Sequence, residues 1–138
     1  METNIKYLVD TNVWLERLLD QDKSKIVERF LEITPVSQIF ISDFALHSIG
    51  VILSRLKKTV VFEKFLSDLF INGKIERLSL NTVDLFDVLL NIKKFNLDFD
   101  DSYQLTIAQK YDLTVVTFDK DFNSIGINRI SPEELLKK

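Results

Sequence analysis

Residues 5–12 read IKYLVDTN, an apolar run that is interrupted by one lysine and ends directly at Asp10. Residues 115–119 read VVTFD and have the same design, because an apolar run ends two residues before Asp119. Short apolar runs bounded by polar residues are typical of buried strands. If the two strands are parallel neighbours, Asp10 and Asp119 face one crevice outside the carboxyl edge of the sheet, where ligands bind in such folds.

The rest of the chain alternates between helical and strand patterns. A long helix is capped by Ser42 or Asp43, and residues 131–134 (SPEE) form a capping box with proline at the first helical position. The predicted strands are residues 5–9, 39–41, 74–80, 113–118 and 125–130. The predicted helices are residues 11–19, 23–33, 43–58, 60–71, 82–95, 100–111 and one from 131 onward. Strands separated by helices favour an α/β fold with a mostly parallel sheet.

Length and composition exclude several classes of protein. The 138 residues suit one domain, predicted over residues 1–138, and a net charge of −3 excludes a strongly basic domain that binds nucleic acid through bulk charge. There is no cysteine and one histidine, which excludes a disulfide framework and a zinc site built from cysteine or several histidines. The N-terminus has no signal-peptide pattern and no apolar run is long enough to span a membrane, so we expect a cytoplasmic protein.

Acidic residues gather around the two strand ends. Asp98, Asp100 and Asp101 lie at the start of one predicted helix, and Asp121 follows Asp119 closely. Each of them could simply cap a helix or turn. Several carboxylates crowded together repel one another, and a hard divalent cation relieves that repulsion. Oxygen ligands without histidine or cysteine favour Mg²⁺ or Mn²⁺, and such sites commonly act on phosphoryl groups.

Three motifs together resemble the PIN domain, whose commonest small members are the VapC-like ribonuclease toxins of bacterial and archaeal toxin–antitoxin pairs. They are DTN at residues 10–12, FDDSY at 99–103 and VTFDKDF at 116–122. The resemblance implies a three-layer α/β/α fold and a Mg²⁺- or Mn²⁺-dependent ribonuclease. It implies that Asp10, Asp101 and Asp119 are catalytic metal ligands and that Asp121 is an additional ligand. Supporting positions beside these acids are Thr11, Asn12, Asp100 and Thr117.

The second motif departs from the family pattern. PIN domains usually place a glutamate about six residues after a serine like Ser42, and here that position is Ser48, with His47 beside it. Three outcomes are open. The remaining acids still bind metal, or His47 or Ser48 takes the lost role, or the protein binds without cleaving. As the lone histidine of an apolar helix, His47 is also open to interpretation as a hydrogen-bonded core or groove residue.

The resemblance also implies partners. Toxins of this family form homodimers and bind an antitoxin. The stretch from Phe62 to Phe70 is apolar on more than one face, which suits a dimer or partner surface but equally an ordinary core helix. We therefore predict an RNA-cleaving PIN-type nuclease that acts as the toxin of a toxin–antitoxin pair and has no membrane partner. The alternative is a catalytically weakened PIN-like module that binds RNA or a protein without cleaving.

Overall fold

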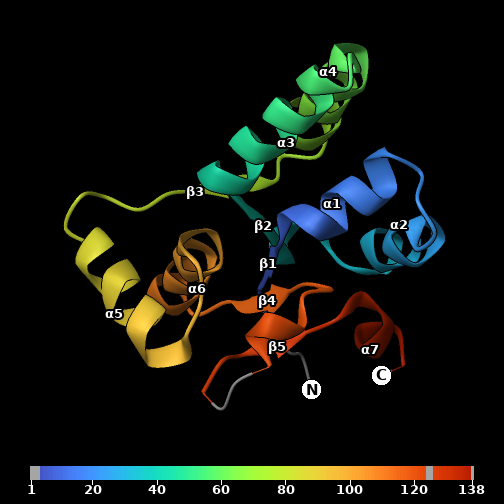
Figure 1. The fold of residues 1–138 in the computed structure, drawn as a ribbon. Coiled ribbons are helices and arrows are strands. Elements are labelled where there is room, and N and C mark those ends of the chain that lie inside the picture. Colours follow the sequence, from blue (N-terminus) through green and yellow to red (C-terminus); the bar gives the residue numbers. More distant parts are fainter. Residues whose placement is uncertain (1–3, 124–125, 138) are drawn as a thin grey trace.

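A computed structural model of the chain describes residues 4–123 and 126–137. Within these residues, five short strands form one sheet in the order β3-β2-β1-β4-β5, and every neighbouring pair is parallel (Figure 1). The strands are β1 (Tyr7–Val9), β2 (Ile39–Ser42), β3 (Glu76–Leu78), β4 (Thr114–Val116) and β5 (Arg129–Ile130). The predicted α/β class with a short parallel sheet is therefore confirmed.

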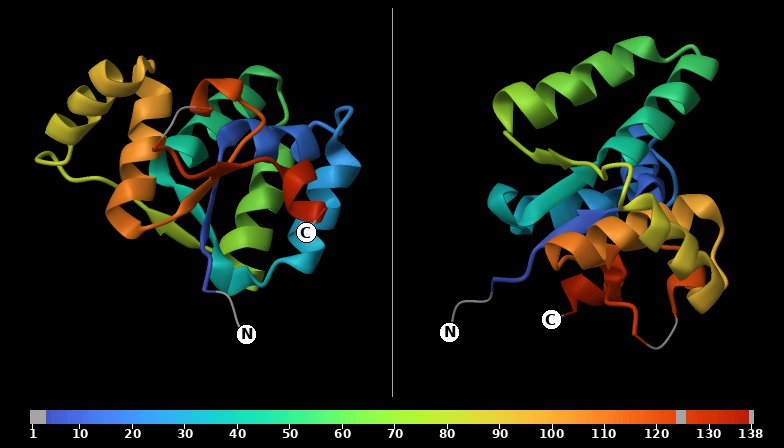
Figure 2. Two further views of the ribbon diagram at one scale, coloured as in Figure 1. Left: turned by 90° about the horizontal axis from the view of Figure 1, so that it is seen from below. Right: turned by 90° about the vertical axis from the view of Figure 1, so that its left-hand side faces the viewer.

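Helices cover both faces of this sheet, which gives the three-layer α/β/α arrangement (Figures 1 and 2). Successive strand residues point to opposite faces. Accordingly, Leu8 and Val115 pack with α5 and α6, whereas Val9 and Val116 pack with the other helices. The helices are α1 (Thr11–Leu18), α2 (Ser24–Ile33), α3 (Asp43–Arg55), α4 (Thr59–Leu66), α5 (Leu85–Phe95), α6 (Phe99–Tyr111) and α7 (Pro132–Leu136).

Helices α3 and α4 pack together as a pair that rises beyond the sheet (Figure 2, right). Ser42 caps α3, because its hydroxyl accepts a hydrogen bond from the backbone N–H of Ala45 at 2.8 Å. The chain returns to β3 after α4 through a π-helical segment, Ser67–Asn72. Phe65 is buried, and its ring centroid lies 5.4 Å from that of Trp14. For this part of α4, the core-helix interpretation is the correct one.

Several predicted elements are longer than the observed ones. The strands predicted at 5–9, 74–80, 113–118 and 125–130 shorten to β1, β3, β4 and β5, and the helix predicted at 60–71 ends as an α-helix at Leu66; Ile125 lies outside the described residues. The helix predicted from residue 82 begins at Leu85. It starts late because Asn81 and Asp84 close a turn by exchanging backbone-to-side-chain hydrogen bonds of 2.9 and 3.1 Å.

The predicted capping box is present at α7. The Ser131 hydroxyl accepts a hydrogen bond from the backbone N–H of Glu134, whose carboxylate accepts one from the backbone N–H of Ser131. In the described ranges, no helix has the length and apolar character that crossing a membrane requires.

Candidate active site

The site lies where β1 and β4 end side by side. Val9 pairs with Val116 in parallel register, so the residues that follow them emerge at the same edge of the sheet. The backbone N–H of Asp10 also donates to the carbonyl of Val116 at 2.9 Å. This pairing places Asp10 beside Thr117 and brings the loop that carries Asp119 against the start of α1.

Asp10 is a buried carboxylate in a dense set of hydrogen bonds. Its Oδ1 accepts from the backbone N–H of Thr11 at 2.8 Å and from Nε2 of Gln104 at 3.1 Å. Its Oδ2 accepts from the hydroxyl of Thr117 at 2.8 Å. Burial raises the pKa of Asp10 above its ordinary value, and these hydrogen bonds oppose the rise in part. The same contacts fix the orientation of both carboxylate oxygens.

Thr117 connects the two acidic loops. While it donates to Asp10, its hydroxyl oxygen accepts from the backbone N–H of Asp119 at 2.9 Å and from Nδ2 of Asn12 at 3.2 Å. Asn12 in turn accepts a hydrogen bond from the backbone N–H of Phe118 at 3.3 Å. Asn12 and Thr117, two of the polar residues predicted beside the acids, therefore hold the loop after β4 against the start of α1.

Three further carboxylates converge beside Asp10. One carboxylate oxygen from each of Asp101, Asp119 and Asp121 lies within 4.8 Å of the other two. Asp101 stands in the first turn of α6, whose N-cap is Asp98. Burial first, and next the negative charge of Asp119, raise the pKa of Asp101 to about 8. In the metal-free protein this carboxyl group therefore keeps its proton near neutral pH.

These acids surround a small open pocket of about 290 Å³. Its walls include Thr11, Asn12 and the carboxylates of Asp10, Asp100, Asp101 and Asp119. Asp121 is exposed and contributes to the cluster from outside this lining. No lysine, arginine or histidine is among the residues that line the pocket, so its negative charge has no cationic neighbour in the lining.

Helix α3 supplies the opposite wall of this acidic pocket. Phe44, Ser48 and Ile52 line it at a spacing of four residues, which places them on one face of the helix. The position where a PIN domain usually has glutamate thus faces the acids but is a serine. His47 lies on the neighbouring helix face, is exposed, and does not line the acidic pocket. Of the two interpretations, core or groove residue, the core one does not hold, because His47 is exposed and lines a neighbouring pocket.

Gln104 was missed by the sequence analysis. It is 3% exposed and lines the acidic pocket, one helical turn after Asp101. Its Nε2 donates to Asp10, whereas its Oε1 is buried without a hydrogen-bond partner. A signal was available, because residues three apart on a helix share a face. Glutamine is common in helices, however, and without the packing nothing singled it out.

The donor set fits a hard divalent cation. All the side-chain donors that converge here are oxygens, which suits Mg²⁺ or Mn²⁺ better than Zn²⁺. Burial is the main cause of the raised pKa values of Asp10 and Asp101, and the negative charge of Asp119 adds to both.

Comparison with family models adds an independent finding: the model described as PIN domain matches residues 7–128. The chain belongs to the PIN domain family. The match spans β1 to the residue before β5 and so includes all the acids of the site. A comparison with curated protein sequences found no match.

Solved structures share this PIN fold. A toxin–antitoxin complex from Klebsiella pneumoniae superposes with a TM-score of 0.75 at 19% identity, covering 92% of this chain and 98% of that one. FitAcB from Neisseria gonorrhoeae superposes with a TM-score of 0.72 at 20% identity, covering 92% of this chain and 98% of FitAcB. VapC20 of Mycobacterium tuberculosis is a sarcin–ricin loop cleaving toxin. It superposes with a TM-score of 0.72 at 16% identity, covering 88% of this chain and 96% of VapC20. At these identities the likeness establishes the fold.

Proposed function

We propose that this PIN domain is a Mg²⁺- or Mn²⁺-dependent endoribonuclease that hydrolyses RNA phosphodiesters. The observation that carries the proposal is the convergence of carboxylates from three separate segments: Asp101, Asp119 and Asp121 form one cluster, and Asp10 lines the same pocket as Asp101 and Asp119. Such a cluster is costly to assemble without a cation. Membership of a nuclease fold family adds support.

The residues divide into ligands and supports. Asp10, Asp101 and Asp119 would hold the cation, with Asp121 as an additional ligand. A divalent cation at these oxygens supplies Lewis acidity for attack of water on a phosphodiester. Thr117 keeps Asp10 oriented and the Asp119 loop in place. The pocket-lining side chains of Thr11, Asn12 and Asp100 are available to orient water or a phosphate oxygen.

Function as the toxin of a toxin–antitoxin pair is part of the same proposal. Structures that share the fold include a toxin–antitoxin complex and VapBC bound to DNA. The proposal implies two partners, an antitoxin and a second copy of the chain. It also implies that the protein acts in the cytoplasm. Helix α5 leaves Phe86, Leu89 and Leu90 exposed, apolar surface of the kind that a partner covers.

One observation favours a second candidate function. Ser48 faces the acids where the family usually has a carboxylate, and this loss lowers the negative charge that attracts a cation. The alternative is therefore a PIN module that binds RNA or a protein without cleaving. The two candidates differ in whether metal produces cleavage.

The deciding experiment incubates a panel of structured and single-stranded RNAs with Mn²⁺, Mg²⁺ or EDTA. The variant Asp10→Asn tests the site, and any cleavage that persists in it would reveal a contaminating nuclease. The matched control is Asp22→Asn, which removes an exposed acid outside the pocket. Metal-dependent cleavage by wild type and Asp22→Asn, but not by Asp10→Asn, is expected. Equal cleavage by Asp10→Asn would overturn the site, and no cleavage by wild type in either metal would favour the non-cleaving module.

A further inference from the structure

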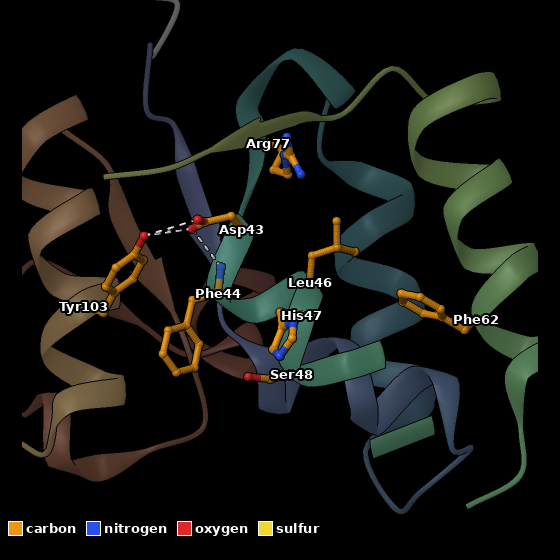
Figure 3. Close-up of a pocket in the computed structure, with 8 residues that line it drawn as sticks. All are labelled: Asp43, Phe44, Leu46, His47, Ser48, Phe62, Arg77 and Tyr103. Atoms are coloured by element: carbon orange, nitrogen blue, oxygen red, sulfur yellow. Dashed lines mark hydrogen bonds between the residues drawn. The ribbon is translucent and has the colours of Figure 1, made fainter. Parts of the chain in front are cut away.

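A second and larger hollow, of about 580 Å³, adjoins the acidic pocket and lies over the outer face of α3 (Figure 3). It extends between α6 on one side and α4 on the other, with Arg77 of β3 at its upper edge in this view. We call it the Arg77 pocket. None of the acids of the metal-ligand cluster lines it.

The two hollows share a wall. Phe44 and Ser48 line both of them, so the Arg77 pocket begins where the acidic pocket ends. A polymer whose scissile phosphate lies at Asp10 and Asp119 would pass over Phe44 and Ser48 into the second hollow. A mononucleotide would not need this extension, whereas a chain of nucleotides would follow it.

The electrostatic character changes across that shared wall. Arg77 and His47 line the Arg77 pocket and are exposed, and none of the ion pairs among the described residues includes Arg77. The one acid in this lining is Asp43, whose carboxylate accepts hydrogen bonds from the Tyr103 hydroxyl at 3.0 and 3.3 Å and from the backbone N–H of Phe44 at 2.8 Å. Asp43 keeps its negative charge, but these hydrogen bonds hold its oxygens and it forms no ion pair with Arg77 among the described residues, so the Arg77 guanidinium is available to a phosphate.

Aromatic rings complete the pocket. Phe44 packs against Tyr103 with ring centroids 5.3 Å apart, and Phe62 reaches in from α4. The Phe62 ring lies against Gly50 of α3, where a Cβ atom would stand 3.1 Å from it. A side chain at residue 50 would therefore push this ring from its place. Unpaired bases of single-stranded RNA stack on such rings.

We propose that the Arg77 pocket is a nucleotide subsite for single-stranded RNA, in which Arg77 contacts a phosphate neighbouring the scissile one and a base lies against the aromatic wall. The subsite rests on the proposed nuclease function and defines its substrate as an unpaired strand longer than one nucleotide. A protein segment would be an alternative occupant, but an exposed arginine beside stacking rings matches a phosphate-linked base.

The test measures binding rather than cleavage. In an Asp10→Asn background with EDTA, fluorescence anisotropy follows a labelled single-stranded oligoribonucleotide over a series of KCl concentrations. Adding Arg77→Gln should weaken binding several-fold and make the slope of log K against log salt shallower by about 0.7, the value for one lost single-strand phosphate contact. Arg29→Gln, which removes an exposed arginine on α2, should change neither quantity.

The outcomes separate this inference from the proposed function. If wild type cleaves RNA but Arg77→Gln binds with the affinity and salt slope of Arg29→Gln, the subsite is wrong and the nuclease stands. If wild type does not cleave but Arg77→Gln alone weakens RNA binding, the subsite stands and the nuclease is wrong. Loss of binding to a protein partner, with RNA binding unchanged, would assign the pocket to that partner and overturn the inference. Thermal unfolding of each variant checks that the fold is retained.

Discussion

The two walls of the acidic pocket differ sharply in charge. The wall formed by the ends of β1 and β4 and the start of α6 carries the carboxylates of Asp10, Asp101 and Asp119. The wall formed by α3 presents Phe44, Ser48 and Ile52, none of them charged. A cation in this pocket would therefore have its charged ligands on one side only.

The walls also differ in how firmly their polar groups are held. On the charged wall, hydrogen bonds from Thr117 and Gln104 fix the Asp10 carboxylate. On the α3 wall, Ser48 is the one polar side chain in the lining. The comparison shows that the charged wall accumulates repulsion that nothing opposite it relieves. Each variant below changes one wall and leaves the other intact.

Asp10→Asn should have the largest effect, because it removes the most firmly held carboxylate from the charged wall. We expect affinity for Mn²⁺ to fall by more than about 100-fold, since even outer partners of metal ligands are typically worth 10- to 100-fold. Titration calorimetry measures this affinity, and the Mn²⁺-dependent rise in melting temperature should disappear with it. Asp22→Asn is the control, and a wild-type response in Asp10→Asn would contradict the assignment.

Gln104→Leu should have the next largest effect. It removes the donor to Asp10 Oδ1 and the unpartnered Oε1, leaving an apolar side chain of similar size. We expect Mn²⁺ affinity to fall by about 10- to 100-fold, as for other partners that orient a metal ligand. Calorimetry and cleavage rates check this. If the melting temperature of the metal-free protein falls while Mn²⁺ affinity is unchanged, Gln104 has only a packing role.

Ser48→Glu should reduce the difference in charge between the two walls, because it places a carboxylate on the α3 wall. We expect Mn²⁺ affinity to rise by about 3- to 10-fold, because affinity of oxygen-ligand sites increases with ligand charge. His47→Glu is a matched control: it adds the same charge one residue away, on the face that lines the Arg77 pocket. Equal gains from the two variants would mean that position 48 has no special access to the acids.

The smallest of these expected effects is the one that Asp101→Asn has on the stability of the metal-free protein. The pKa of Asp101 is about 8 when folded and 3.8 in its unperturbed state, so the folded chain holds this proton more tightly. The group's contribution to stability is complete below about pH 4 and is lost as pH rises toward 8. With EDTA, Asp101→Asn should therefore melt a few degrees above wild type at pH 8.5, and by a smaller margin at pH 4.5. A difference that does not vary with pH would contradict the shifted pKa.

Much of the fold and part of the candidate site could be predicted because the relevant signals are local. The apolar residues before Asp10 and those before Asp119 each indicate a buried strand. Parallel pairing of the two strands then brings the two acids together. The capping box at Ser131 and Glu134 is likewise a pattern of adjacent residues. The lengths of the strands could not be predicted this way: β1 and β4, inside the sheet, and β3 and β5, at its edges, are all shorter than the predicted strands, because pairing partners decide where a strand stops.

The sequence by itself determined three features: the alternation of strands and helices, the acids at the strand ends and the absence of a carboxylate at position 48. Each of them depends only on residues that are close together in the sequence. Only the tertiary structure decided that Gln104 bonds Asp10, which is 94 positions away in the chain. It alone decided that Ser48 faces the acids while His47 and Arg77 line a separate pocket. These facts depend on how α3, α6 and β3 pack around one sheet edge, and packing joins residues whose separation along the chain carries no local signal.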